Sequence, residues 1–351
     1  MAMSKIHLLI IGGVPDDNRA EVRRWTPNGI DLLYDGNVTA DAIMRDERLE
    51  VMQLILGGSN PSRDFNLTRR PDVAFNLVCN AESSARSLDM SDKVCASLAR
   101  DGIPVLNPPD RVRGTTRTAS AALFAGLDRI EVPEVRKLES PNMRSIQRLL
   151  DSKEISYPSI VRTAADHNGA NMIRLRGPRD LEKLERLPFD GRDYCVSRFI
   201  DYRDPEGLYG KLRLVKVGRK FLPRHLIVSA DWKIHSGQRA EKINASSESR
   251  ARERAYLQDP STFLGESLYG QLVTGLERTG LDYVGVDFGL LGDGRAVFFE
   301  CNACTNAATR SSRPGEDPER ATIKKKIGAA FFECVQQAAQ AQQPEKEHEI
   351  Q

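Results

Sequence analysis

A predicted β-hairpin near the C-terminus constrains the fold of this chain more than any other segment does. Residues 281–291 (LDYVGVDFGLL) and residues 296–302 (AVFFECN) both have the β-branched and aromatic content of strands. Between them lie Asp293 and Gly294, an Asp-Gly pair that favours a two-residue hairpin turn. The sequence therefore predicts two antiparallel strands whose pairing is set by this turn.

The turn predicts which residues face each other across the hairpin. With a two-residue loop, Gly292 faces Arg295. Further along the strands, Asp287 then faces Glu300, and the alternation of side chains puts Asn302 on the same face. The opposite face is apolar and is expected to pack into the core, since it carries Val284, Val286, Phe288, Leu290, Val297, Phe299 and Cys301.

This pairing would place the Asp287 and Glu300 carboxylates next to each other, with Cβ atoms roughly 5 Å apart. Like charges at this distance are destabilising unless a cation lies between them. A hard divalent ion such as Mg²⁺ carrying phosphates suits such a set of oxygen ligands, with Asn302 as the third. The alternative is a solvated acidic hairpin tip, and the apolar opposite face favours the metal site.

The stretch LDYVGVDFGLLGDGRAVFFECNACTNAA resembles the metal-binding hairpin of the ATP-grasp superfamily. The pattern there is an aspartate, a glutamate thirteen residues later and an asparagine two residues further, which here are Asp287, Glu300 and Asn302. D-alanine–D-alanine ligase, glutathione synthetase and the glutamate-adding peptide ligases carry it. The resemblance implies ATP and two Mg²⁺ ions as cofactors. It also implies an α/β fold in which two antiparallel-sheet subdomains clamp ATP beside an N-terminal parallel α/β lobe.

The composition argues against several classes of partner. The formal charge of +2 gives no long-range attraction to nucleic acid, and no apolar run approaches the roughly 20 residues of a membrane-spanning helix. The six cysteines show no zinc-binding spacing, and Cys301 falls on the apolar face of the hairpin. We therefore expect a cytoplasmic protein with packed thiols that binds neither nucleic acid nor a membrane.

Breaks in the predicted elements divide the chain into parts. Strand–helix alternation suggests a parallel α/β lobe over residues 1–108, which ends at the Asn-Pro-Pro break. We expect a central subdomain with a lid loop over residues 109–195 and a C-terminal subdomain with the metal hairpin over residues 196–340. A polar tail over residues 341–351 is expected to be disordered. Helices are expected over residues 84–100, 112–125, 143–150, 262–279 and 318–339.

Two predicted strands, residues 158–163 and residues 172–175, flank the loop AADHNGAN. The ATP-grasp resemblance implies that this loop closes over the triphosphate, with Arg162 and Arg117 in place of two phosphate-binding lysines. Arginine suits this role, because its fork binds two phosphate oxygens at once. The resemblance also implies an adenine and ribose site near Asp201. The implied nucleotide contacts are Arg117, Arg162, His167, Asn168, Gly169, Arg198, Phe199, Ile200, Asp201 and Lys211.

A second predicted hairpin has strands at residues 208–217 and residues 220–228, joined by a Gly-Arg turn. A two-residue turn places Arg213 opposite Arg224 and puts His225 on the other face. Opposed arginines repel each other, so a phosphate or a substrate carboxylate between them would explain the pair. An exposed strand edge that carries arginines is the alternative.

The resemblance implies a ligase that uses ATP to join a carboxylate to an amine. The substrate carboxylate would attack the γ-phosphate, and the resulting acylphosphate would react with the amine. Arg310, with Arg313 beside it, would grip the substrate carboxylate, although both residues also suit a surface loop. The substrate is expected to be an amino acid or a peptide, and a homodimer is usual among such ligases. A kinase that stops at phosphoryl transfer and a nucleotide-binding module without turnover are the alternatives.

Overall fold

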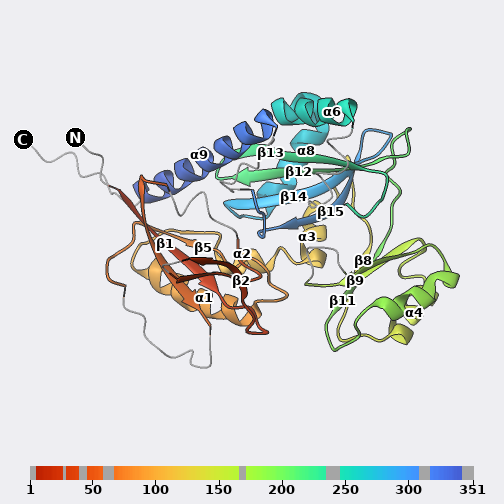
Figure 1. Cartoon of the computed structure of the whole chain (residues 1–351), viewed down its shortest axis with the longest axis horizontal. Coiled ribbons are helices and arrows are strands. Elements are labelled where there is room, and N and C mark those ends of the chain that lie inside the picture. The colour runs from red at the N-terminus through yellow and green to blue at the C-terminus, as the bar shows by residue number, and fades with distance from the viewer. Residues whose placement is uncertain are drawn as a thin grey trace, which may run out of the picture.

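The computed structural model of the protein describes residues 5–26, 29–38, 46–57, 67–165, 171–234, 246–307 and 317–341. Three larger β-sheets and the helices around them form an N-terminal, a central and a C-terminal lobe (Figure 1). One of these sheets is parallel and the other two are mainly antiparallel. The predicted α/β fold class is therefore confirmed.

The N-terminal lobe contains a parallel sheet with the strand order β4–β1–β5–β6. Leu9 and Ile11 of β1 pack against α1, whereas Leu8 and Ile10 face the core that this lobe shares with the C-terminal lobe. This burial of both faces explains the continuous apolar run in β1. The elements are β1 (Ile6–Gly13), β4 (Leu49–Leu56), β5 (Val73–Asn76), β6 (Val105–Leu106), α1 (Ala85–Arg100) and a separate hairpin of β2 (Glu21–Thr26) and β3 (Gly29–Leu33).

The central lobe contains an antiparallel sheet with the strand order β10–β9–β11–β8. Val161 and Val196 of this sheet pack against Ile146 and Leu149 of α4, so one sheet face forms a small core of its own. The proposed domain boundary after residue 195 lies inside β11, and a boundary after β11 would keep that strand whole. The elements are β8 (Val135–Leu138), β9 (Ser159–Thr163), β10 (Met172–Leu175), β11 (Tyr194–Arg198), α4 (Met143–Asp151) and the 3₁₀ helix η1 (Pro178–Arg186).

The C-terminal lobe contains a five-stranded sheet with the order β13–β12–β14–β15–β7. Figure 1 shows α6, α8 and α9 along one side of this sheet, and their apolar residues join its core. Within the described ranges, no helix is long and apolar enough to cross a bilayer. The elements are β7 (Ile130–Glu131), β12 (Tyr209–Val217), β13 (Lys220–Ser229), β14 (Tyr283–Leu290), β15 (Ala296–Asn302), α2 (Pro109–Arg113), α3 (Arg117–Phe124), α6 (Ser247–Gln258), α7 (Pro260–Leu264), α8 (Glu266–Arg278) and α9 (Pro318–Gln340).

The β14–β15 hairpin pairs Asp287 with Glu300, as predicted, but it does so through two compensating irregularities. The turn is one residue longer than predicted, because Leu291 rather than Gly292 pairs with Arg295. A β-bulge between the turn and the two acids then shifts the register back. The prediction for the acids is therefore right, although the predicted turn is wrong.

The bulge also changes which residues of β15 reach the core. Val297 and Phe299 were predicted on the core face. Both instead belong to a separate apolar cluster with Phe199 and Tyr202, on the other face of the sheet. Phe298 takes their place in the main core. The extra residue of a bulge reverses the alternation on one side of it, and the sequence alternation alone does not show that reversal.

The β12–β13 hairpin does not place Arg213 opposite Arg224, which corrects the sequence prediction. Arg213 pairs with His225, because a register shift follows Arg213 in the direction of the turn. Arg224 is the extra residue at this register shift in the β12–β13 hairpin and is 9% exposed. The argument for an anion between two opposed arginines therefore fails.

One core and one covalent link join the N-terminal and C-terminal lobes. Phe75 of β5 packs edge-to-face against Tyr283 of β14, with ring centroids 6.2 Å apart. The buried Asn107 side chain donates a hydrogen bond to the Tyr283 carbonyl at 2.7 Å. Cys79 and Cys304 form a disulfide across 225 positions of sequence, with their Cα atoms 5.0 Å apart. The spacing of the cysteines did not predict this pair.

Candidate functional site

Four polar residues form a row across the C-terminal sheet. His225, Arg213, Asp287 and Glu300 lie in register on the adjacent strands β13, β12, β14 and β15. Residues paired in this way point to the same face of a sheet. Asp287 is 1% exposed and Glu300 is 8% exposed, so the two predicted acids are buried and do not form a solvated hairpin tip.

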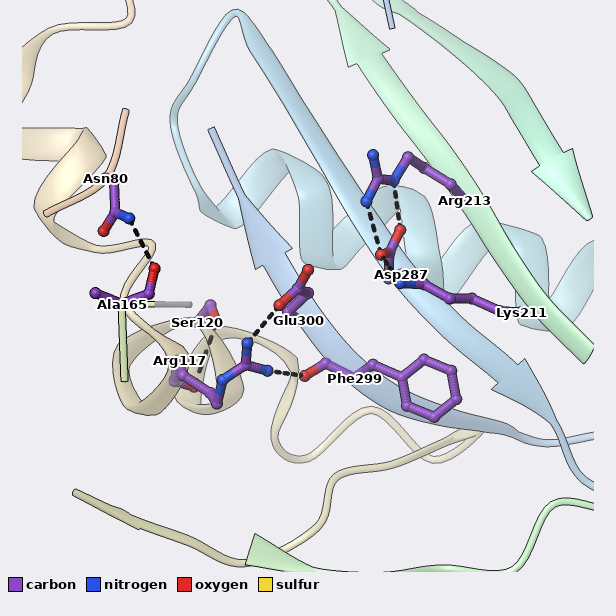
Figure 2. A network of polar contacts seen from close by, with 9 residues as sticks. All are labelled: Asn80, Arg117, Ser120, Ala165, Lys211, Arg213, Asp287, Phe299 and Glu300. Atoms are coloured by element: carbon purple, nitrogen blue, oxygen red, sulfur yellow. Dashed lines mark hydrogen bonds and ion pairs between the residues drawn. The ribbon is translucent and has the colours of Figure 1, made fainter. Parts of the chain in front are cut away.

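Two cations of β12 hold the Asp287 carboxylate (Figure 2). The Lys211 ammonium lies 2.6 Å from Oδ2 of Asp287, and the Arg213 guanidinium binds both carboxylate oxygens. Burial alone would raise the pKa of Asp287, but Arg213 and Lys211 outweigh it and hold the pKa below its ordinary value. Asp287 is therefore ionised at neutral pH.

Arg117, the first residue of α3, binds the carboxylate of Glu300. Arg117 donates through Nη2 to Oε2 of Glu300 at 2.5 Å and through Nη1 to the Phe299 carbonyl at 3.1 Å, and Figure 2 shows it reaching from α3 to β15. Burial lowers the pKa of Arg117, but Glu300 reverses this effect and the net shift is upward. The cations that neutralise the two acids are thus side chains of the chain itself.

A cavity opens beside these charges, between the central sheet and the C-terminal sheet. Its walls are apolar, with Val135, Ile160 and Met172 from the central sheet facing Val297 and Phe299 from β15. Its polar end carries Arg117, Arg162, Lys211 and Glu300. An apolar cavity with a cationic end suits a purine ring joined to a polyphosphate.

A second and smaller cavity lies on the far side of the Arg117–Glu300 pair, since both residues line both cavities. The N-terminal lobe supplies one wall through the loop that follows β5. The lining is polar and includes Asn302, which is 6% exposed. The residues around this cavity are Cys79, Asn80, Ala81, Glu82, Thr115, Thr116, Arg117, Glu300 and Asn302.

Several residues predicted to contact the nucleotide line the larger cavity. They are Arg117, Arg162, Arg198, Phe199, Ile200 and Lys211. Arg198 is also paired with Glu131 and Glu134, at 2.7 Å and 2.6 Å. The structure therefore brings three of the predicted arginines, the neighbouring Phe199 and Ile200, and Glu300 of the predicted metal hairpin to one cavity.

Four predicted residues line none of the described cavities. Two of them, Asp287 and Arg213, bind each other, and the other two are Asp201 and Arg224. Asp201 lies outside the residues that line the described cavities and is held by Arg203, whose Nη2 lies 2.5 Å from Oδ2. Arg224 lies in β13 and likewise lines none of them. The resemblance implied Asp201, whereas Arg224 was predicted from a hairpin register that the structure does not keep.

Four predicted site residues fall outside the residues that the structure describes. His167, Asn168 and Gly169 belong to the segment between residues 165 and 171, and Arg310 belongs to the segment between residues 307 and 317. Their proposed contacts with phosphate and with the substrate carboxylate stay predictions.

Sequence reasoning missed two charged residues close to the site. Glu82 follows β5 and lines the smaller cavity. Lys137 of β8 lies in the same register row as Cys195 and Arg162. A signal for Glu82 was present, because ligands of parallel α/β sheets bind beyond the carboxyl ends of the strands. No such signal marked Lys137, because the pairing of a short polar strand cannot be read from its sequence.

The donor set of the hairpin suits a hard divalent ion. Asp287 and Glu300 supply carboxylates from paired positions, and the register places Asn302 opposite Gly285, two residues from Asp287. All three donors are oxygen atoms, as Mg²⁺ prefers. The described residues contain no group of three or more histidine, cysteine, aspartate or glutamate side chains that would hold a metal. The candidate set here has two carboxylates and an amide.

Comparison with solved structures identifies the architecture. D-alanyl-alanine synthetase A from Vibrio cholerae aligns with a TM-score of 0.55 and 11% identity over 97% of this chain and 100% of that chain. The ATP-complexed D-alanine–D-alanine ligase from Bacillus anthracis gives 0.52 and 13% over 96% and 99%. A RimK domain ATP-grasp protein from Sphaerobacter thermophilus gives 0.50 and 15% over 94% and 99%. This chain has the ATP-grasp fold.

The similarity to these ATP-grasp structures extends over nearly the whole chain, so it includes the N-terminal lobe. At such low identity it is a similarity of fold. No protein-family model matches the sequence, and a comparison with curated proteins finds no match. The argument for function therefore depends on the residues of the site.

Proposed function

We propose that this protein is an ATP-dependent ligase that joins a carboxylate to an amine through an acylphosphate. The observation that carries the proposal is the arrangement around Arg117 and Glu300. On one side of this pair lies an apolar cavity with a cationic end, and on the other side lies a small polar cavity. The first suits ATP, and the second suits a small polar substrate next to the γ-phosphate.

The charged residues would act mainly by positioning and by charge neutralisation. Arg117, Arg162 and Lys211 line the polar end of the larger cavity and would bind the phosphate oxygens of ATP. Phosphoryl transfer needs little covalent chemistry from the protein, so fixed cations supply much of the catalysis. The fold of the relatives supports this use of the cavity, since one of them was solved with ATP.

Asp287, Glu300 and Asn302 would hold Mg²⁺ in this proposal. Bound there, the metal would neutralise charge on the phosphates. Arg213 and Lys211 keep Asp287 ionised for this role, and Arg117 pairs with Glu300. The substrates would be a carboxylate, an amino acid or a peptide, and an amine acceptor.

The decisive measurement is ADP release from Mg-ATP with pools of amino acids and dipeptides. We expect release that depends on both a carboxylate and an amine. Release without any added amine would instead identify a kinase. Binding of Mg-ATP without release in any pool would identify a nucleotide-binding module, and either result would contradict the ligase proposal.

The Glu300→Gln variant tests the site directly. The amide keeps the shape of the side chain but loses its charge, so we expect ADP formation to fall by roughly 100-fold or more while the circular dichroism spectrum is unchanged. Glu333→Gln is the matched control, because Glu333 lies on α9 away from the site and pairs with the exposed Lys220 of β13. Full turnover in Glu300→Gln would show that the metal assignment is wrong.

A further inference from the structure

The loop that follows β5 carries a half-buried acid that lines the smaller cavity. We propose that Glu82 binds the ammonium group of an amino-acid substrate there. This inference rests on the proposed ligase function and adds the class of substrate to it. It assigns a binding role to the N-terminal lobe, which otherwise supplies no charged residue to either cavity among the residues described as lining them.

The position of the smaller cavity favours a substrate as its occupant. Arg117 and Glu300 separate it from the larger cavity, and Asn302 of the metal hairpin lines it. A group that attacks the γ-phosphate in line must approach from the side away from the nucleotide. The polar lining suits a small polar group better than a large apolar one.

The charge of the ligand group follows from Glu82 itself. Oε1 of Glu82 is buried and has no hydrogen-bond partner in the described part of the chain. A buried carboxylate oxygen without a donor is unfavourable, so native structures rarely keep one without a reason. An ammonium group supplies both the missing donor and the opposite charge.

The loop holds Glu82 in a fixed place before any ligand arrives. The Asn80 side chain accepts hydrogen bonds from the backbone N–H groups of Glu82 at 3.0 Å and of Ser83 at 3.3 Å. It also donates to the carbonyl of Ala165, at the base of the predicted lid, at 3.2 Å (Figure 2). The disulfide of Cys79 fastens the start of the loop to the C-terminal lobe. A fixed carboxylate loses little entropy on binding.

A structural role is the competing explanation, because Glu82 also lies near Arg117, Lys137 and Arg162. As a counter-ion only, Glu82 would affect the stability of the protein and its affinity for ATP. As an ammonium ligand, it would affect discrimination between a substrate with an amino group and the same acid without one. These two readouts separate the explanations.

The experiment measures binding by isothermal titration calorimetry in the presence of Mg-ADP. The probes are single amino acids and their desamino analogues, such as alanine with propionate and glutamate with glutarate. We expect the full-length protein to bind at least one amino acid at least tenfold more tightly than its analogue. Glu82→Gln should remove that preference, and Glu82→Asp should restore part of it, because the charge returns.

The control is Glu47→Gln, a charge loss at an exposed residue of the same lobe, which should leave the preference intact. Equal binding of amino acids and analogues by the wild type, binding of neither, or an unchanged preference in a folded Glu82→Gln would overturn the inference. The ligase proposal fails separately, when the wild type releases no ADP with any pool of carboxylates and amines.

Discussion

At the scale of single residues, the buried ion pairs of the site are the features with the largest energetic consequences. Asp287 is held by two cations of one strand, and both partners are largely shielded from water. The removal of one partner from a buried pair leaves an incompletely compensated charge, which costs much more than the loss of a surface pair. The site is therefore part of what stabilises the C-terminal sheet.

We predict that Arg213→Met lowers the free energy of unfolding by about 3 kcal/mol, because Asp287 is left with Lys211 alone. Urea denaturation monitored by circular dichroism measures this loss. Arg203→Met is the matched control, since the Arg203–Asp201 pair is exposed, and it should cost less than about 1 kcal/mol. Equal losses in the two variants would contradict the view that the Asp287 cluster is buried.

We predict that the substitution Glu82→Gln changes the stability of the protein in a pH-dependent way. Burial raises the pKa of Glu82 above its ordinary value, and Arg117, Lys137 and Arg162 only partly offset this, while Asp193 adds to it. For a raised folded-state pKa, the stabilisation is complete below the unfolded pKa and is lost as the pH rises through the folded pKa. Glu82→Gln is neutral at every pH and avoids this loss.

The melting temperature of ligand-free Glu82→Gln should therefore exceed that of the wild type at pH 8, and the difference should shrink toward pH 5. Differential scanning fluorimetry across this range is the measurement. A variant that is less stable than the wild type at pH 8 would mean that Glu82 is fully satisfied by its cations. A stabilising substitution that removes ligand binding is the usual trade-off at a functional site.

At the scale of elements, the β14–β15 turn decides how the hairpin begins. Gly294 has φ +78°, a left-handed conformation that favours glycine, whereas Gly292 does not. We predict that Gly294→Ala destabilises the protein by about 1 kcal/mol, and that Gly292→Ala, with open space around its Cα, changes stability much less. Urea denaturation of the two variants compares them. Similar losses would contradict the three-residue turn.

The hairpins also show why elements are easier to predict than their register. The Asp-Gly signal located the β14–β15 turn, and the apolar content located both strands. The bulges were invisible, because an extra residue in a strand has no reliable sequence pattern. They reversed the predicted faces of Val297 and Phe299 and separated Arg213 from Arg224. A helix was also predicted incorrectly. The predicted helix over residues 262–279 is broken at Gly265 into α7 and α8.

At the scale of the whole molecule, the Cys79–Cys304 disulfide joins the two lobes that enclose the smaller cavity. A cross-link across a long loop removes much entropy from the unfolded chain, which gives an upper value of about 5 kcal/mol for a loop of this length. We predict that dithiothreitol lowers the melting temperature of the wild type and has no such effect on Cys304→Ser.

Thiol counting checks the same bond independently. The chain has six cysteines, of which four are free and buried in the structure. Denatured, unreduced protein should therefore take up four alkyl groups from iodoacetamide, and reduced protein should take up six, as measured by mass spectrometry. Uptake of six groups without reduction would show that the two sulfurs are not bonded in solution.

The sequence by itself determined the local features of this protein, because they depend on neighbouring residues. The Asp-Gly turn, the strands on either side of it and the spacing of Asp287, Glu300 and Asn302 were sufficient to predict the β14–β15 hairpin and, through a resemblance, the ATP-grasp fold. The helices at Ala85–Arg100 and Pro318–Gln340 were also predicted from capping residues and apolar periodicity.

Only the tertiary structure decided what surrounds those acids. Arg117, Glu82 and Cys79 reach the site from elements more than a hundred residues away from β15, and their distance in sequence hides their proximity. Burial then sets their chemistry, because a charge removed from water must find a partner within its immediate surroundings. The pattern along the chain shows which residues are able to carry charge chemistry, and packing between lobes decides which of them meet.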